Sequence, residues 1–297
     1  MRLSTRVAVL CAGLFVSHQA AAADLPQRWV SAGGALSEWV SALGGESKLV
    51  GVDTTSQHPQ SLNSLPKIGY QRQLSAEGIL SLRPNVLAGT EEMGPPPVLE
   101  QLRAAGVQVE VLSAGAELPA LDGNLRRLGA LLGAQERASQ LLSGYRQDLE
   151  RQHGWVLQAQ QHQSAPGVLL MVSHLGDKPL VAGADTVGDW LIKQAGGRNL
   201  ATHKGYKVFS VEAMAGLNPD VLVFTDRAPT GASRDALLKE NPVLAASRAV
   251  RNGRLVEVDP TLLVGGLGPR LPDAIRTLSK AFYPEDPALH AKVPSSQ

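Results

Sequence analysis

The chain reads Gly69-Tyr70, then Ser75-Ala76-Glu77, then Pro84-Asn85-Val86-Leu87, and it repeats this phrase as Gly205-Tyr206, then Ser210-Val211-Glu212, then Pro219-Asp220-Val221-Leu222. In both copies the proline stands nine positions after the serine. Such a serine can cap a helix, and the proline ends that helix before a short apolar run typical of a buried strand. The repeat predicts two lobes built on one plan, with any ligand held between them.

Strand-like and helix-like segments alternate on either side of the middle of the chain. In the first half, the expected strands are 48–52, 85–88 and 107–112, and the expected helices are 36–43, 98–105 and one capped by Ser75. In the second half, the expected strands are 167–172, 221–224 and 254–258, and the expected helices are 185–195, 236–246, 272–282 and one capped by Ser210. This alternation predicts an α/β fold whose lobes each have a mostly parallel sheet flanked by helices.

The middle of the chain has the apolar spacing of a single helical face and shows no strand-like segment. The spacing predicts one helix of about 35 to 40 residues, long enough at about 1.5 Å per residue to lie along both lobes as a rigid spine. The expected organisation is an N-terminal lobe at 24–120, a connecting helix at 121–164 and a C-terminal lobe at 165–297.

Residues 1–23 have the pattern of a signal peptide, with a basic start, a short apolar run at 7–16 and small residues up to Ala23. Cleavage after Ala23 would place the protein in the periplasm. The only cysteine, Cys11, lies in this leader, and because Leu10 precedes it a lipid anchor is not expected. The exported chain would therefore have neither a disulfide nor a cysteine metal site.

The charges of the exported chain balance. Removing Arg2 and Arg6 from the 28 Lys and Arg residues leaves 26, against 27 Asp and Glu residues. A near-neutral protein has no electrostatic basis for binding nucleic acid. Beyond the leader, no apolar stretch is long enough to cross a membrane. We expect a soluble monomer.

Motifs of enzymes are missing from the sequence. The Gly-rich stretch 265–270 lacks the Gly-Lys-Ser/Thr of a phosphate loop, so it indicates a tight strand-to-helix connection. The sequence has neither a His-Glu-x-x-His motif nor a Gly-x-Ser-x-Gly motif. The mature histidines are dispersed, at His58, His153, His162, His174, His203 and His290. We therefore expect no catalysis.

The paired glutamates Glu77 and Glu212 have two interpretations. A carboxylate in the first turn of a helix interacts favourably with the helix dipole, which explains each glutamate as a structural feature. Equivalent glutamates on two lobes also suit two basic pockets on a two-fold symmetric partner.

Tyr70 stands in an expected loop, two positions before Arg72. Phenolate is a hard anionic ligand for ferric iron, and tyrosine is a known axial ligand of haem. Because a free tyrosine has a pKa near about 10, such a site needs a nearby cation to favour the phenolate. Arg72 can supply the charge, and so can an arginine of the opposite lobe such as Arg227, which follows a strand at the end where ligands of α/β proteins gather.

The stretch 69–84 resembles periplasmic haem-binding proteins of bacterial ABC-type haem importers, and so do Gly197-Arg198-Asn199 and 263–270. The resemblance covers nearly the whole mature chain. It implies the class III substrate-binding fold, in which one long helix joins two α/β lobes. It also implies that Tyr70 is the axial ligand to the iron of ferric haem b, with Arg72 and Arg227 near the phenolate.

The resemblance further implies that Glu77 and Glu212 engage arginine pockets on an inner-membrane ABC permease, which works with its ATPase subunits. An outer-membrane haem receptor would be the upstream source of haem. Tyr206 is a candidate for lining the haem site, while His174 is not assigned, so one bound haem is expected. The alternatives are a carrier of ferric siderophore or corrinoid on the same scaffold, an exported metallohydrolase and a purely structural interaction protein.

Overall fold

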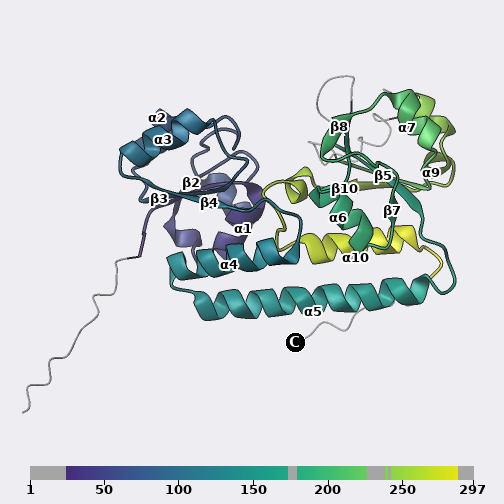
Figure 1. The fold of residues 1–297 in the computed structure, drawn as a ribbon, viewed down its shortest axis with the longest axis horizontal. Coiled ribbons are helices and arrows are strands. Elements are labelled where there is room, and N and C mark those ends of the chain that lie inside the picture. Colours follow the sequence, from purple (N-terminus) through teal and green to yellow (C-terminus); the bar gives the residue numbers. More distant parts are fainter. Residues whose placement is uncertain (1–24, 173–178, 226–237, 240–241, 287–297) are drawn as a thin grey trace, which may run out of the picture.

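The computed structural model describes residues 25–172, 179–225, 238–239 and 242–286, and Figure 1 shows their two lobes. The N-terminal lobe is built on a parallel sheet of order β2-β1-β3-β4. Its strands are β1 (Trp29–Ala32), β2 (Leu49–Val52), β3 (Val86–Thr90) and β4 (Gln108–Leu112). Its helices are α1 (Gly34–Ala42), α2 (Ala76–Ser81), α3 (Pro96–Ala104) and α4 (Leu118–Leu132), with short 3₁₀ turns η1 (Glu46–Lys48) and η2 (Gln60–Ser64).

The C-terminal lobe has a mixed sheet of order β10-β9-β5-β6-β8, with β7 beside β5. Its strands are β5 (Gly167–Val172), β6 (Leu180–Ala182), β7 (Arg198–Asn199), β8 (Tyr206–Val208), β9 (Val221–Thr225) and β10 (Leu255–Val258). Its helices are α6 (Val187–Gln194), α7 (Val211–Leu217), α9 (Arg248–Arg251) and α10 (Leu271–Phe282), with 3₁₀ turns η3 (Pro242–Ala246) and η4 (Pro260–Leu263). The sequence did not predict β6 and β8, which are three residues each and add an antiparallel edge.

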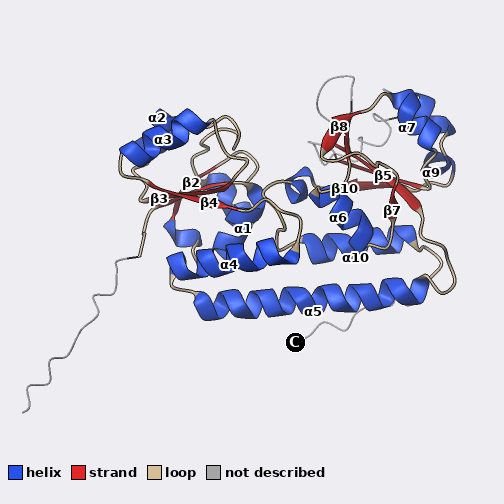
Figure 2. Cartoon of the chain, viewed as in Figure 1, coloured by secondary structure: helices blue, strands red, loops and turns tan. Residues whose placement is uncertain are grey.

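Each sheet lies between two layers of helices (Figure 2). Alternate residues of β1 face opposite sides, so that Val30 and Ala32 pack under α2 and α3 while Trp29 joins the core on the other side. An equivalent small core lies under α7 and α9, around Leu169 and Phe224. The largest core is continuous between the two lobes on the side of α4 and α10. The predicted α/β class is confirmed, and the two lobes share one core.

The prediction of one uninterrupted helix over 121–164 is wrong. The chain forms α4 and then α5 (Gln135–Ala159), and the two helices are separated by Gly133 in the left-handed conformation at φ 70°. Only glycine adopts this conformation at little cost, and it closes α4 as a C-terminal cap. Helix α5 then runs back beneath α4 and continues under α10, so that α5 alone spans both lobes (Figure 1).

Helix α5 contacts both lobes through a narrow stripe of buried side chains. The stripe repeats at alternating intervals of four and three residues, at Ala138, Leu142, Tyr145, Leu149, Gln152, Val156 and Ala159. A glycine allows close approach near each end of the stripe. An added Cβ on Gly129 of α4 would lie 2.9 Å from the Ala138 Cβ, and one on Gly196 would lie 2.4 Å from Val156 Cγ1. This close packing along the buried stripe therefore holds both lobes against one straight helix, α5.

The repeated phrase produces the same local structure in each lobe. Ser75 and Ser210 each accept a hydrogen bond from a backbone N–H in the first turn of the following helix, as predicted. Arg83 and Asn218, which precede the two prolines, are both left-handed, at φ 48° and φ 45°. Asn85 accepts hydrogen bonds from the backbone where β1 begins, and Asp220 does so where β5 begins. The repeat therefore continues beyond the residues that are identical.

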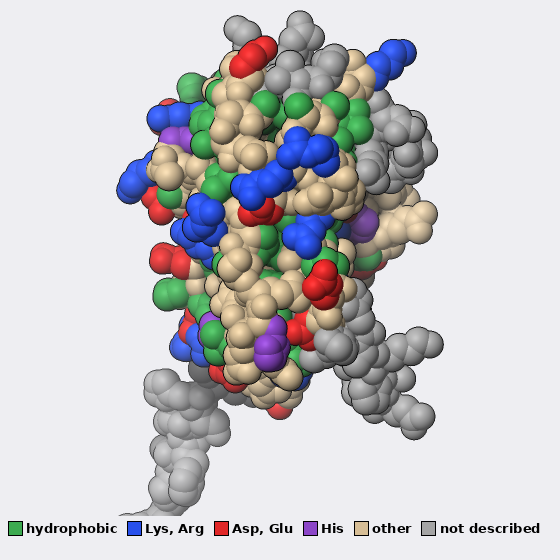
Figure 3. Space-filling model, turned by 90° about the vertical axis from the view of Figure 1, so that its right-hand side faces the viewer, with side chains coloured by type: hydrophobic (Ala, Val, Ile, Leu, Met, Phe, Trp, Pro, Cys, Tyr) green, Lys and Arg blue, Asp and Glu red, His purple; other side chains and the backbone are tan. Residues whose placement is uncertain are grey.

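The surface at the end of the C-terminal lobe carries basic and acidic side chains interspersed with polar and apolar ones (Figure 3). This mixture agrees with the balance of 28 Lys and Arg against 27 Asp and Glu. Within the described ranges, no helix combines the length and the apolar character that a membrane span requires.

We expect Gly196→Ala to lower the free energy of unfolding by about 2–5 kcal/mol. Gly196 has φ 85°, where a side chain costs about 1–2 kcal/mol, and the added methyl would overlap Val156 and Tyr283, at a further cost of about 1–3 kcal/mol. The matched control is Gly44→Ala, which has φ 84° but nothing within 4 Å of the added Cβ. Urea denaturation should show a clearly larger loss for Gly196→Ala, and equal losses would contradict the close packing of α5.

Candidate functional site

The loops at the carboxyl ends of the parallel strands of the two sheets meet between the lobes. The Ala35 N–H donates to the Val264 carbonyl at 3.2 Å, and the Trp39 indole N–H donates to the Leu267 carbonyl at 2.8 Å. Gly265 and Gly266, at φ 90° and 84°, turn the chain from η4 towards α10, which confirms the predicted tight connection. Ligands of α/β proteins bind beyond the carboxyl ends of their strands. We call this surface, formed by the loops after β1, β2, β3 and β10, the inter-lobe face.

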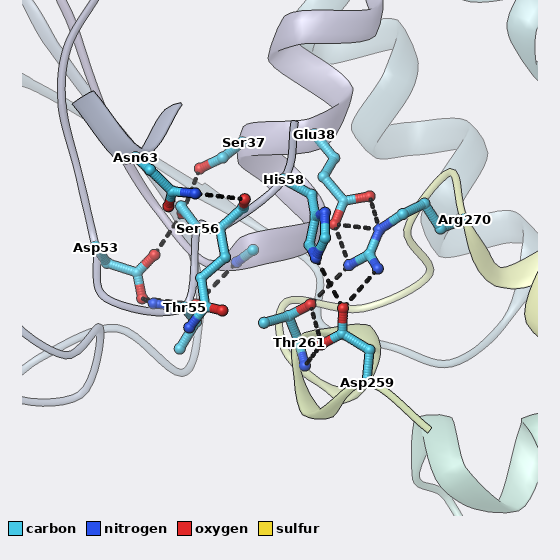
Figure 4. Close-up of polar contacts among 12 residues, drawn as sticks. Ser37, Glu38, Asp53, Thr55, Ser56, His58, Asn63, Asp259, Thr261 and Arg270 are labelled. Carbon is cyan, nitrogen blue, oxygen red and sulfur yellow. Dashed lines mark hydrogen bonds and ion pairs between the residues drawn. The ribbon is translucent and has the colours of Figure 1, made fainter. Parts of the chain in front are cut away.

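An inter-lobe ion cluster of Glu38, His58, Asp259, Thr261 and Arg270 joins the lobes at this face (Figure 4). The Arg270 guanidinium donates to both Glu38 oxygens, at 2.7 and 2.9 Å, and to Asp259 Oδ2 at 2.8 Å and Thr261 Oγ1 at 2.7 Å. His58 Nε2 lies 2.8 Å from Asp259 Oδ2. This fork geometry orients α1 of one lobe relative to α10 of the other.

The hydrogen bonds of the cluster favour the ionised forms of Asp259 and Arg270. Burial acts to raise the pKa of Asp259, but hydrogen bonds from Thr261 and Arg270 outweigh it and leave this pKa below its usual value. Burial acts to lower the pKa of Arg270, but Glu38 and Asp259 raise it on balance. Asp259 and Arg270 therefore remain charged at neutral pH.

A second polar network, around Asp53, orders the loop that follows β2 (Figure 4). Asp53 is fully buried; its Oδ1 accepts from the Gly33 N–H at 3.0 Å and from Ser56 Oγ at 2.6 Å, while its Oδ2 accepts from Thr55 Oγ1 at 2.7 Å. A buried carboxylate is stable only when its oxygens are paired in this way. The next residue, Thr54, donates its N–H to the Gly69 carbonyl at 2.9 Å, so the network supports the turn that carries Tyr70.

Tyr70 stands in a tight turn between β2 and α2. Gly69, at φ 91°, opens the turn, and the Gln73 N–H closes it on the Tyr70 carbonyl at 2.7 Å. The Tyr70 side chain is 41% exposed. Two positions further on, the Arg72 guanidinium forms an ion pair with Glu92 at 2.5 Å. The turn therefore holds an exposed tyrosine, and the arginine two positions later in the same loop is paired with Glu92.

Tyr206 lies on β8 in the C-terminal lobe. The residue is 37% exposed, and its hydroxyl is hydrogen-bonded to Thr186 and to the backbone of Gly188 at the start of α6. Burial and the negative charge of Glu92 raise the pKa of Tyr206 to about 12, and hydrogen bonding to Thr186 and Gly188 and the charge of Arg72 offset this only in part. Glu92 and Arg72 belong to the other lobe. Because their charges affect its pKa, Tyr206 lies at the inter-lobe face. It is a neutral phenol at neutral pH.

Glu77 and Glu212 are both exposed and hold the same position in the first turn of α2 and α7. Helices α2 and α7 both lie on the side of the molecule opposite α5 (Figure 1). The two carboxylates therefore form an acidic pair, one per lobe, on one side of the protein.

Several predicted features lie outside the described residues. These are the signal peptide with its cleavage after Ala23, and the residues Arg227 and His174. In the described part of the chain, no three or more His, Cys, Asp or Glu residues gather in a way that could hold a metal ion.

Sequence reasoning missed Glu38, Asp259 and Glu92. Arg270 and Glu38 are 232 positions apart, and Arg72 and Glu92 are 20 apart, so local spacing carried no signal of either pair. The one available clue to the ion cluster was Arg270, the arginine that ends the Gly-rich stretch 265–270. It stands where helix α10 begins.

Two α/β lobes that meet at the carboxyl ends of their strands and share one spanning helix are the architecture of a bilobed ligand-binding protein. A sequence profile of the periplasmic binding protein family matches residues 30–262, and the chain belongs to this family. It has the class III form of this fold.

Solved structures and a curated relative agree with this assignment. The chain is 63% identical to a periplasmic heme binding protein from Pseudomonas aeruginosa, with a TM-score of 0.86 over 88% of this chain and 94% of that chain. It is 35% identical to the periplasmic heme-binding protein BhuT in complex with two hemes, with a TM-score of 0.78 over 86% and 98%. It is 28% identical to YvrC of Bacillus subtilis, an uncharacterized ABC transporter substrate-binding lipoprotein, over 88% of this chain and 81% of the relative.

Removal of Arg270 should destabilise the protein much more than removal of an exposed arginine on the same helix. We expect Arg270→Met to cost about 3 kcal/mol, because the nearly buried Glu38 would lose its counter-ion. Arg276→Met, which breaks an exposed pair with Asp273, should cost at most about 1 kcal/mol. Adding Glu38→Gln to Arg270→Met should recover part of the loss in a double-mutant cycle measured by urea denaturation. Strict additivity would contradict the pairing.

Proposed function

We propose that this protein is a periplasmic carrier that binds ferric haem at the inter-lobe face, with Tyr70 as the axial iron ligand. The observation that carries the proposal is the exposure of Tyr70, held in a hydrogen-bonded turn of a chain that is 63% identical to a heme binding protein. A hard phenolate suits ferric iron and leaves the porphyrin to be held mainly by apolar contact.

The residues around Tyr70 fit this ligand. Arg72 supplies a positive charge two positions from the phenol. Tyr206 and Val208 of β8, which are 37% and 49% exposed, offer apolar surface from the other lobe. The neutral phenol of Tyr206 suits contact with the porphyrin or hydrogen bonding, and its raised pKa disfavours it as a second iron ligand. Arg227 remains a further candidate for stabilising the phenolate.

Delivery follows from the acidic pair. Glu77 and Glu212 would each enter a basic pocket of the inner-membrane permease of an ABC importer, whose ATPase subunits drive uptake. An outer-membrane receptor would supply the haem, and the leader at 1–23 would direct export. We expect the carrier to act as a monomer that binds one haem.

Hemin titration tests the iron ligand. The parent protein should bind one hemin and show the charge-transfer absorption of ferric iron bound to a phenolate. Tyr70→Ala should abolish this band and weaken binding by more than the roughly 10- to 100-fold that loss of an outer-shell partner costs. Tyr206→Phe keeps the ring and should retain the band. If Tyr70→Ala retains the full band, the ligand assignment is wrong, and a preference for ferric siderophore or corrinoid over hemin would indicate the alternative carrier.

Reconstituted transport tests the acidic pair. In vesicles that contain the permease and its ATPase subunits, Glu77→Ala and Glu212→Ala should each lower haem uptake by about tenfold, because each removes one charged contact of about 1.5 kcal/mol. The matched control is Glu100→Ala, an exposed glutamate on α3. All three variants should bind hemin like the parent. Unchanged uptake by the Glu77→Ala/Glu212→Ala double variant would contradict docking through these residues.

A further inference from the structure

Glu92 holds the side chains of both residues that follow Tyr70. Its Oε1 accepts a hydrogen bond from Arg72 Nη2 at 2.5 Å, and its Oε2 accepts one from Gln71 Nε2 at 3.3 Å. Its own N–H donates to Thr90 Oγ1 at 3.4 Å, at the end of β3. Strand β3 lies inside the N-terminal sheet. One carboxylate, anchored beside an internal strand, therefore positions both side chains.

The backbone joins the same two loops. The Gly94 N–H donates to the Gln71 carbonyl at 2.9 Å, and the Leu74 N–H donates to the Gly94 carbonyl at 2.8 Å. The Gln71 side chain is only 1% exposed, and its Oε1 has no hydrogen-bond partner. Glu92 is therefore the group that orients the Gln71 amide, and hydrogen bonds join the turn of Tyr70 to the loop after β3.

The charge of Glu92 also acts beyond its own loop. Glu92 raises the pKa of Tyr206 in the opposite lobe, whereas Arg72 lowers it. The charges of Glu92 and Arg72 therefore affect groups on the opposite side of the inter-lobe face, where the ligand would lie. The negative charge of Glu92 balances the positive charge of Arg72 in this ion pair, so loss of the Glu92 charge would leave the site more positive.

We infer that Glu92 is a positioning residue of the haem site, whose carboxylate fixes Arg72 and Gln71 beside the turn of Tyr70 and whose negative charge stabilises the ferric form of the carried haem. The inference rests on the proposed function. A negative charge near iron favours Fe³⁺ over Fe²⁺ by simple electrostatics. Phenolate binds the ferric form more strongly, so a carboxylate that opposes reduction also opposes premature loss of the cargo.

Two substitutions separate the two roles of Glu92. Glu92→Gln keeps the shape and removes the charge; its amide oxygen can still accept from Arg72, and its NH₂ group can donate to the Gln71 Oε1 if that amide turns over. The ferric-to-ferrous ratio of bound haem at a fixed ambient potential should fall by about tenfold, a positive shift of about 59 mV for one electron. Glu92→Asp keeps the charge but shortens the reach, so haem should pass to apomyoglobin about tenfold faster while the potential stays near that of the parent.

The control is Glu100→Gln, which removes the same charge from an exposed site on α3 and should leave both measurements unchanged. Thermal unfolding of each variant confirms folding before the measurement. A potential for Glu92→Gln equal to that of the parent, or a parental transfer rate for Glu92→Asp, would overturn the inference. Failure of the proposed function has a different result, because the parent itself would then lack the phenolate band with hemin.

Discussion

The rest of the structure depends on the contact between α5 and both lobes. A helix of 25 residues is about 37 Å long, and its buried stripe keeps one direction over that length because it repeats at intervals of four and three. Gly129 and Gly196 bring the backbones of the two lobes close to it. The two lobes are thereby fixed to one straight element, and their cores merge along it. A rotation of one lobe relative to the other would have to break this packing.

The inter-lobe ion cluster also fixes the two lobes relative to each other, at the inter-lobe face and away from α5. Packing along α5 is apolar and does not by itself determine which loops meet across the molecule. The bidentate contact of Arg270 with Glu38 depends on direction, so it fixes the register of α1 against α10. Burying these charges offsets much of the gain in stability, and their contribution lies mainly in orientation. The shared core and the ion cluster would both have to be disrupted before the lobes could rotate apart.

The features that the sequence could predict are those determined by nearby residues. Ser75 and Ser210 cap their helices within three positions, and the prolines at 84 and 219 end them, so both copies of the phrase were correctly placed. The break at Gly133 was missed because a single glycine inside an apolar pattern is compatible with a continuous helix, and only the left-handed φ that it adopts decides the matter. Strands β6 and β8 are too short to show alternation. The exposure of Tyr70 agrees with the loop that was expected, while the contacts of Gln71 and Arg72 with Glu92 are tertiary.

The two copies of the Gly-Tyr pair differ because the C-terminal lobe adds β6 and β8 to a plan that is otherwise shared. In the N-terminal lobe the glycine opens a turn, and Tyr70 is left in a loop with its phenol accessible. In the C-terminal lobe the second tyrosine enters strand β8, where pairing with Ala182 fixes its backbone and its phenol turns towards the start of α6. Burial then holds Tyr206 in the neutral form. The same dipeptide thus gives one tyrosine in a turn, 41% exposed, and one in a strand, 37% exposed, whose hydroxyl is hydrogen-bonded at the start of α6. In the proposed haem carrier, Tyr70 would therefore be a single anionic ligand, without an anionic counterpart in Tyr206.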